Sequence, residues 1–129
     1  MLVARALASG GPEQDAHDHE LLERMVALFM QHYAEKPVVH TRLLPGAREA
    51  LALGLPSALV TNKPRVISVL VLEQLGMAGA FDAVFAGGDG PLKPSPHGVL
   101  EVVRKLGVPI ERAWLIGDGP LDVLAGRAA

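Results

Sequence analysis

Side chains that can do chemistry gather in three short stretches in the second half of the sequence. Thr61 and Asn62 form the first, Lys93 stands in a Lys-Pro-Ser-Pro run, and Asp118 and Asp122 belong to a Gly-Asp-Gly-Pro-Leu-Asp run. A Thr hydroxyl and backbone amides at a helix start can bind phosphoryl oxygens, Lys supplies positive charge, and carboxylates hold Mg²⁺. This combination predicts a phosphate site with a hard cation.

The two carboxylates are spaced four residues apart across a predicted strand-to-helix turn. This spacing can place Asp118 and Asp122 on the same side of a cleft. Gly117 and Gly119 allow the backbone to turn tightly between them. We therefore expect both carboxylates to serve a metal ion.

Each of these features also has an ordinary interpretation. A Thr after a strand is commonly a helix cap, a lone Lys is commonly a solvated surface charge, and Gly-Asp-Gly-Pro is a common turn. The order and placement of all three stretches favour the functional interpretation over these alternatives.

The elements that must position these residues follow a strand, turn, helix pattern that occurs three times from residue 57 onward. The predicted strands are 57–60, 83–85 and 113–116, and the predicted helices are 64–75, 96–106 and 120–128. Such alternation predicts a parallel sheet in an α/β fold. All three chemical stretches would then lie beyond the carboxyl ends of the strands, where open α/β sheets bind ligands.

The first third of the chain is predicted to be mainly helical. Residues 1–8 form a short apolar piece, a Gly-Gly-Pro break follows, and residues 19–35 repeat apolar side chains at helical spacing. A shorter helix is expected to begin at Pro45 and to end at Gly54.

Composition narrows the class of partner. The chain has 129 residues, of which 50% are apolar, 20% charged and 4% aromatic, with a net charge of -2. Few aromatic side chains and no dense Lys/Arg cluster argue against nucleic acid, and no apolar stretch is long enough to span a membrane. We therefore expect partners that are small molecules or proteins. Because the chain has no cysteine, we expect a cytoplasmic protein.

Four ordered motifs carry a resemblance that covers essentially the whole chain. They are Val-Thr-Asn-Lys-Pro at 60–64, Phe-Asp-Ala-Val-Phe with Gly-Gly-Asp at 81–89, Lys-Pro-Ser-Pro at 93–96, and Gly-Asp-Gly-Pro-Leu-Asp at 117–122. This series resembles motifs two to four of the haloacid dehalogenase superfamily, and the first run is similar to the version in its phosphoglycolate phosphatase group. The resemblance implies an incomplete three-layer, Rossmann-like parallel sheet at 45–129, preceded by part of a helical cap domain at 1–44.

The same resemblance implies roles for single residues in a Mg²⁺-dependent phosphatase. Thr61 would bind the phosphoryl group with Asn62 beside it, and Lys93 would neutralise phosphoryl oxygens. Asp118 would hold Mg²⁺, and Asp122 would support the ion directly or through water. The implied partner is a small phosphorylated metabolite: phosphoglycolate, a sugar phosphate or pyrophosphate.

The sequence departs from that family in one respect. Its members begin with an Asp-x-Asp strand whose first Asp attacks phosphorus, and no equivalent is present here. Asp15 and Asp18 follow a Gly-Gly-Pro break without an apolar strand before them, and the neighbouring His17 and His19 lack a further metal ligand at suitable spacing. We therefore expect a chain that is inactive alone.

The missing strand would lie between those predicted at 57–60 and 113–116, in the centre of the sheet. Two unpaired strand edges invite pairing with another chain. A homo-oligomer or a complementing strand is therefore expected. The alternative function is a non-catalytic binding or assembly module that recruits its partner through these edges.

Overall fold

The structure is a computed structural model that describes residues 16–129. The chain forms two compact units, Met1–Pro37 and Val38–Ala129. The assignment of residues 1–44 to a cap and 45–129 to a core stays a prediction.

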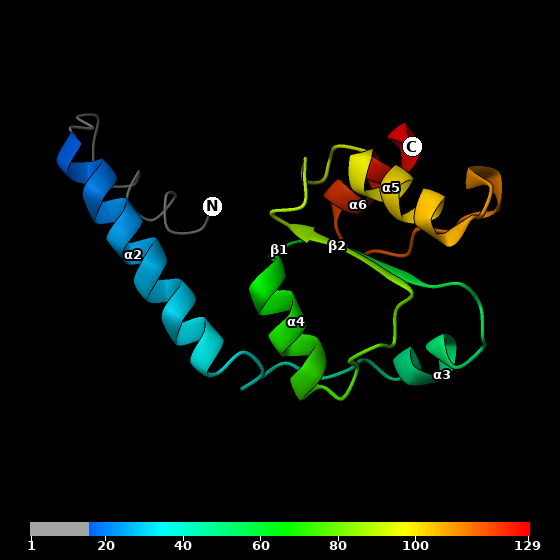
Figure 1. The fold of residues 1–129 in the computed structure, drawn as a ribbon, viewed down its shortest axis with the longest axis horizontal. Coiled ribbons are helices and arrows are strands. Elements are labelled where there is room, and N and C mark those ends of the chain that lie inside the picture. The colour runs from blue at the N-terminus through cyan, green and yellow to red at the C-terminus, as the bar shows by residue number, and fades with distance from the viewer. Residues whose placement is uncertain (1–15) are drawn as a thin grey trace. The chain divides into compact units, whose positions relative to one another are not determined.

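In the first unit, α2 (Ala16–Glu35) is one continuous helix (Figure 1). It confirms the helix predicted at 19–35, whereas the apolar piece predicted at 1–8 lies outside the described residues. The rings of Phe29 and Tyr33 meet edge to face, with centroids 5.6 Å apart, as side chains four residues apart on a helix do.

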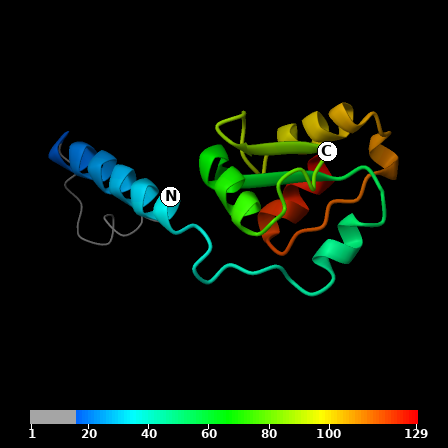
Figure 2. The same ribbon diagram turned by 60° about the horizontal axis from the view of Figure 1, so that its bottom comes forward.

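The second unit alternates strands and helices. Its elements are α3 (Ala47–Leu51), β1 (Ala58–Pro64), α4 (Arg65–Gln74), β2 (Ala83–Gly87), α5 (His97–Leu106), the 3₁₀ turn η1 (Ile110–Arg112) and α6 (Pro120–Ala128). β1 and β2 pair in parallel, with Ala58 opposite Ala83 and Val60 opposite Phe85. Figure 2 shows the two strands side by side. This pairing confirms the predicted parallel sheet for two of its three strands.

Helices cover both faces of the pair. Figure 1 shows α4 on one side of the strands and α5 with α6 on the other. Val102 of α5 packs against Ala83 and Phe85, and Val99 and Val103 pack against Ala125 of α6. Helix α5 therefore joins the strands to α6 through two adjacent core clusters.

The sequence of α5 explains why it takes this place. Its buried valines recur at three- and four-residue spacing, which forms one apolar face. Glu101 on the helix pairs with Arg104 and Lys105 one turn later. Gly107 ends the helix in the left-handed conformation, at φ 64°, a role for which glycine is preferred.

The strand predicted at 113–116 is wrong. These residues belong to no strand in the structure, although Ala113 is extended, at φ -92° and ψ 142°. A strand needs a hydrogen-bonded neighbour, and neither β1 nor β2 pairs with this segment. As a result, the side chains of Trp114 and Ile116 are both 91% exposed.

β1 is longer than predicted. It continues from Ala58 to Pro64, so Thr61 and Asn62 lie within the strand rather than after it. The pairing with β2 is irregular between Val60 and Pro64, and such an irregularity changes the direction in which side chains leave the strand. None of the helices within residues 16–129 is both long and apolar enough to cross a membrane.

Candidate phosphate site

Lys93 lies at the centre of the candidate site. Its Nζ donates to the carbonyl oxygen of Val60 at 2.8 Å and to Oδ1 of Asp122 at 2.6 Å. The side chains of Lys93 and Asp122 are only 14% and 15% exposed. One ammonium group therefore links β1 to the first turn of α6, in a setting where the ion pair is partly shielded from water.

Asn62 fixes the backbone of Lys93. Its Nδ2 donates to the Lys93 carbonyl and its Oδ1 accepts from the Lys93 N–H, both at 2.9 Å. These two bonds occupy the amide oxygen and one amide hydrogen of Asn62. Asn62 is thus a positioning residue for Lys93, and its predicted contact with a phosphoryl group stays a prediction.

Two hydrogen-bond donors hold the Asp122 carboxylate. Besides the Lys93 ammonium, its Oδ2 accepts the N–H of Gly119 at 3.1 Å, which caps the start of α6. The hydrogen bond from Lys93, followed by that from the Gly119 N–H, lowers the pKa of Asp122 below the usual range for an aspartate. Asp122 is therefore ionised at neutral pH.

Gly117 is required by the position of Asp122. A Cβ at residue 117 would lie 2.3 Å from Asp122 Cγ, whereas one at Gly119 would lie 3.4 Å from Asp122 Oδ2. Only a residue without a side chain leaves space for the carboxylate at the first position. The Gly-Asp-Gly run thus shapes the site through packing as well as through its turn.

Thr61 and Asp118 retain hydrogen-bonding capacity. Thr61 Oγ1 accepts the N–H of Lys63 at 3.1 Å, which leaves the hydroxyl proton able to donate. The Asp118 side chain is exposed and makes no hydrogen bond or ion pair with residues 16–129. Asp118 and Asp122 therefore have different surroundings, because only Asp122 is neutralised by Lys93.

The metal-ligand set is small. Within the described part of the chain, no three His, Asp or Glu side chains are grouped so as to hold a metal ion. Asp118 offers an uncommitted carboxylate, whereas Asp122 would have to share its oxygens with Lys93. The roles of both residues in binding Mg²⁺ stay predictions.

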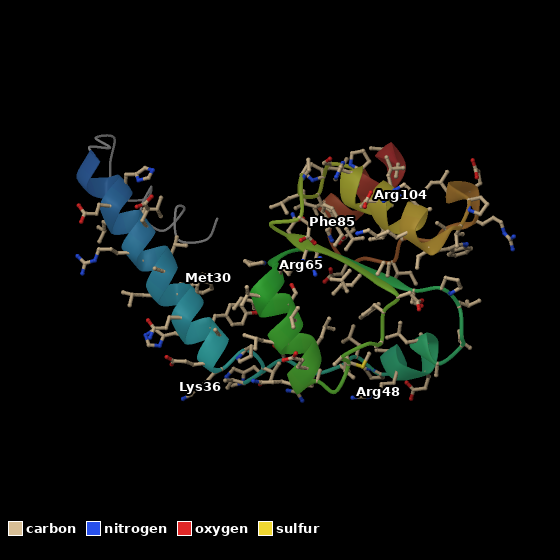
Figure 3. The ribbon with its side chains drawn as sticks, viewed as in Figure 1. Met30, Lys36, Arg48, Arg65, Phe85 and Arg104 are labelled. Atoms are coloured by element: carbon tan, nitrogen blue, oxygen red, sulfur yellow. The ribbon has the colours of Figure 1, made fainter. Side chains whose placement is uncertain are left out.

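A second charged cluster lies elsewhere, and sequence reasoning missed it. A hollow of about 460 Å³ is lined by Arg65, Phe85, Asp89, His97, Glu101 and Lys105. Figure 3 shows Arg65 at the start of α4 and Phe85 on β2. Asp89 belongs to the Gly-Gly-Asp run, but nothing in the sequence indicates that Arg65, 24 residues earlier, is its partner. The acidic and basic side chains here pair with one another, Arg65 with Asp89 and Lys105 with Glu101.

Together, the fold and the site define a parallel α/β domain in which the Lys93–Asp122 ion pair lies beside β1 at Val60. The chain belongs to the haloacid dehalogenase-like hydrolases, whose family model matches residues 2–129. This match confirms the resemblance and the fold class predicted from the four motifs.

Several proteins that the chain resembles are named as phosphoglycolate phosphatases. The chain is 38% identical to a probable phosphoglycolate phosphatase of Pseudomonas putida, over 100% of this chain and 53% of that protein. It is 40% identical to the phosphoglycolate phosphatase of Aquifex aeolicus, over 83% of this chain and 53% of the relative. The crystal structure of a predicted phosphoglycolate phosphatase from Haemophilus somnus matches with a TM-score of 0.81 and 26% identity, over 98% of this chain and 57% of that one. The chain thus spans about half the length of these relatives.

Proposed function

We propose that this chain is the phosphate-binding part of a Mg²⁺-dependent phosphomonoesterase of the phosphoglycolate phosphatase type. We further propose that it binds phosphate but does not hydrolyse phosphate esters alone. The observation that carries the proposal is the Lys93 ammonium, which is held by Asn62 and lies between Val60 O and Asp122. The relatives named as phosphoglycolate phosphatases support the substrate class.

In this proposal, the Lys93 ammonium binds the phosphoryl oxygens of the ligand. A dianionic phosphate would compete with Asp122 for the ammonium, because charge-assisted hydrogen bonds to either anion are similar in kind. Thr61 would donate its hydroxyl proton to another phosphoryl oxygen. Asn62 would keep the Lys93 backbone in place, so that the ammonium is positioned before the ligand arrives.

The residues present fit a loosely held magnesium ion. Mg²⁺ commonly binds through one or two carboxylates together with substrate phosphate and water, and Asp118 offers an exposed carboxylate that no side chain among residues 16–129 engages. We assign Asp118 as the ligand and Asp122 as a supporting group. A bound Mg²⁺ would neutralise charge on the phosphoryl oxygens.

Inactivity of the isolated chain is part of the proposal. The only carboxylate bonded to Lys93 among residues 16–129 is Asp122, whose charge is already neutralised by that lysine. Asp18 lies in helix α2 rather than on a strand, and Asp15 lies outside the described residues. Without a nucleophile, most of the rate enhancement of a covalent mechanism should be lost.

Phosphate binding is tested by calorimetry with inorganic phosphate, with and without Mg²⁺. We expect Lys93→Met to abolish binding and Lys105→Met to leave it unchanged, since Lys105 is a half-exposed lysine on α5 outside the site. Thermal unfolding checks that both variants fold. If the natural chain fails to bind phosphate, the proposed site is wrong.

Hydrolysis of p-nitrophenyl phosphate and of phosphoglycolate tests the second part. We expect no Mg²⁺-dependent turnover by the chain alone. Turnover that Asp118→Asn abolishes, and that Glu111→Gln at an exposed position does not, would show that the assignment of inactivity is wrong. The cytoplasmic location, proposed from the lack of cysteine, is tested separately by cell fractionation.

A further inference from the structure

The same run of residues, Gly-Asp-Gly-Pro-Leu, occurs twice in the chain, at 88–92 and at 117–121. In each run the aspartate is followed by glycine, and no other aspartate of the sequence precedes a glycine. An aspartate side chain can form a five-membered ring with the backbone nitrogen of the next residue, most easily where glycine leaves that nitrogen unobstructed. Because the two runs are identical, a difference in their reactivity must come mainly from the fold.

The first run holds its aspartate in place. Asp89 Oδ1 accepts a hydrogen bond from Arg65 Nε at 2.6 Å, and Oδ2 accepts the N–H of Ala86 at 2.8 Å. The following glycine is also closely packed, because a Cβ at Gly90 would lie 3.2 Å from the His97 ring. Ring closure at Asp89 would therefore require both carboxylate oxygens to leave their partners.

The second run leaves its aspartate free to turn. The Asp118 side chain is exposed and makes no hydrogen bond or ion pair with residues 16–129. The N–H of the next residue, Gly119, donates to Asp122 Oδ2 at 3.1 Å. That bond runs along the N–H direction, within the peptide plane, whereas the nitrogen attacks a carboxyl carbon through a face of the plane. The hydrogen bond therefore leaves the path of attack open.

We propose that Asp118 is a site of spontaneous modification, at which a cyclic imide formed with Gly119 converts aspartate to isoaspartate, whereas the fold protects Asp89. In the first step, the Gly119 nitrogen bonds to Asp118 Cγ and a C–O bond of the carboxyl group breaks. That oxygen leaves as water, with the proton of the carboxylic acid and the proton of the amide. In the second step, water adds to one of the two ring carbonyls and its bond to nitrogen breaks.

The two ways of opening the ring have different products. Opening at Cγ restores aspartate, whereas opening at the main-chain carbonyl of Asp118 leaves the chain linked through the side chain. The isoaspartyl linkage adds one carbon to the main chain directly before α6 and moves the free carboxylate to the α carbon. The mass of the chain stays unchanged, but the carboxylate that we assign to Mg²⁺ is displaced. The ring chemistry itself involves only residues 118 and 119 and water, so it does not depend on the proposed function.

The experiment incubates the natural chain at neutral pH in heavy-oxygen water, without Mg²⁺ or phosphate. Each opening of the ring then leaves one heavy oxygen at the aspartate that reacted. Digestion with trypsin in ordinary water separates the two runs, because one lies between the cleavage sites at Arg65 and Arg104 and the other between those at Arg112 and Arg127. Mass spectrometry counts the heavy oxygen in each peptide, and fragmentation distinguishes isoaspartate from aspartate.

The folded chain should react at Asp118 roughly fivefold or more faster than at Asp89, because the side chain of Asp89 must first break its hydrogen bonds. In guanidinium chloride the two rates should become equal, since unfolding leaves only the identical local sequence. The comparison of folded with unfolded chain needs no substitution.

Three variants locate the cause of the difference. Gly119→Ala places a methyl group beside the attacking nitrogen and should slow the reaction at residue 118 several-fold. Arg65→Met removes the guanidinium that holds Asp89, and should speed the reaction there without changing Asp118. Arg104→Met, which removes an exposed arginine of α5, is the matched control and should change neither rate. Circular dichroism confirms that the variants fold.

Equal rates at the two aspartates of the folded chain would overturn the inference, as would a faster reaction at Asp89. Rates that still differ after unfolding would also overturn it, by showing that residues flanking the runs cause the difference. Absence of heavy oxygen at residue 118 under conditions that label the unfolded chain would show that the fold protects Asp118 as well. If Arg65→Met unfolds, the natural chain in its two states still decides the question.

Discussion

At the scale of single residues, the site depends on one ion pair and the glycine beside it. Lys93 and Asp122 are nearly buried and 2.6 Å apart, and Asn62 holds the lysine backbone from β1. Asp122 in turn leaves no space for a side chain at residue 117. These dependencies make Gly117 as important to the site as the charged residues, although glycine does no chemistry.

Gly117→Ala is expected to be more damaging than Gly119→Ala. The first Cβ would overlap Asp122 at 2.3 Å, while the second stays 3.4 Å from it. We expect the unfolding free energy to fall by about 1–3 kcal/mol for Gly117→Ala, as overpacking does, and by less than about 1 kcal/mol for Gly119→Ala. Urea unfolding measures both values. Equal stability of the two variants would show that Asp122 does not require this space.

At the scale of elements, the Arg65–Asp89 pair connects α4 to the turn after β2. The hydrogen bond from Arg65, followed by that from the Ala86 N–H, lowers the pKa of Asp89 to about 2. A carboxylate whose pKa is lower in the folded state stabilises the fold above its unfolded pKa, and this contribution is lost as pH falls through the folded value. The relevant window runs from about pH 4 down to about pH 2.

Asp89→Asn should therefore lower the unfolding free energy at pH 7, with a difference from the natural chain that shrinks below about pH 4 and disappears near pH 2. The effect should be below about 1 kcal/mol, because Arg65 is 45% exposed and water screens the pair. Denaturant unfolding across this pH range measures it, with Asp118→Asn as a control that removes an exposed carboxylate without an ion pair in the part of the chain that the structure describes. A difference that is constant with pH would contradict an electrostatic origin.

The sequence predicted elements better than their contacts. Helices α5 and α6 were expected within one residue of their observed bounds, because valine spacing and Pro120 mark them clearly. The strand at 113–116 was wrong because extended, apolar residues become a strand only when a neighbour pairs with them. The bonds between Asn62 and Lys93 join residues 31 apart in sequence, and no local pattern indicates them.

At the scale of the whole molecule, the chain combines a family match along its length with about half the length of its relatives. Among residues 16–129 the sheet has two strands, and Ala113, whose backbone is extended, lies outside it. The residues of the proposed site nonetheless belong to a single unit. Lys93, its hydrogen-bond partners and both core clusters all lie in Val38–Ala129. The second unit therefore contains what is needed for the proposed phosphate site.

This distribution predicts that the chain can be shortened to residues 38–129 without loss of the site. Both described core clusters stay intact in the shortened chain, since all of their members follow residue 38. We expect phosphate affinity within about twofold of the full chain, a change of roughly 0.4 kcal/mol or less, and a single cooperative thermal transition. Calorimetry and circular dichroism on the two lengths measure these quantities, and Lys93→Met in the short chain provides the matched negative control. If the short chain folds but no longer binds phosphate, residues 1–37 contribute directly to the site, and its assignment to the second unit alone is wrong.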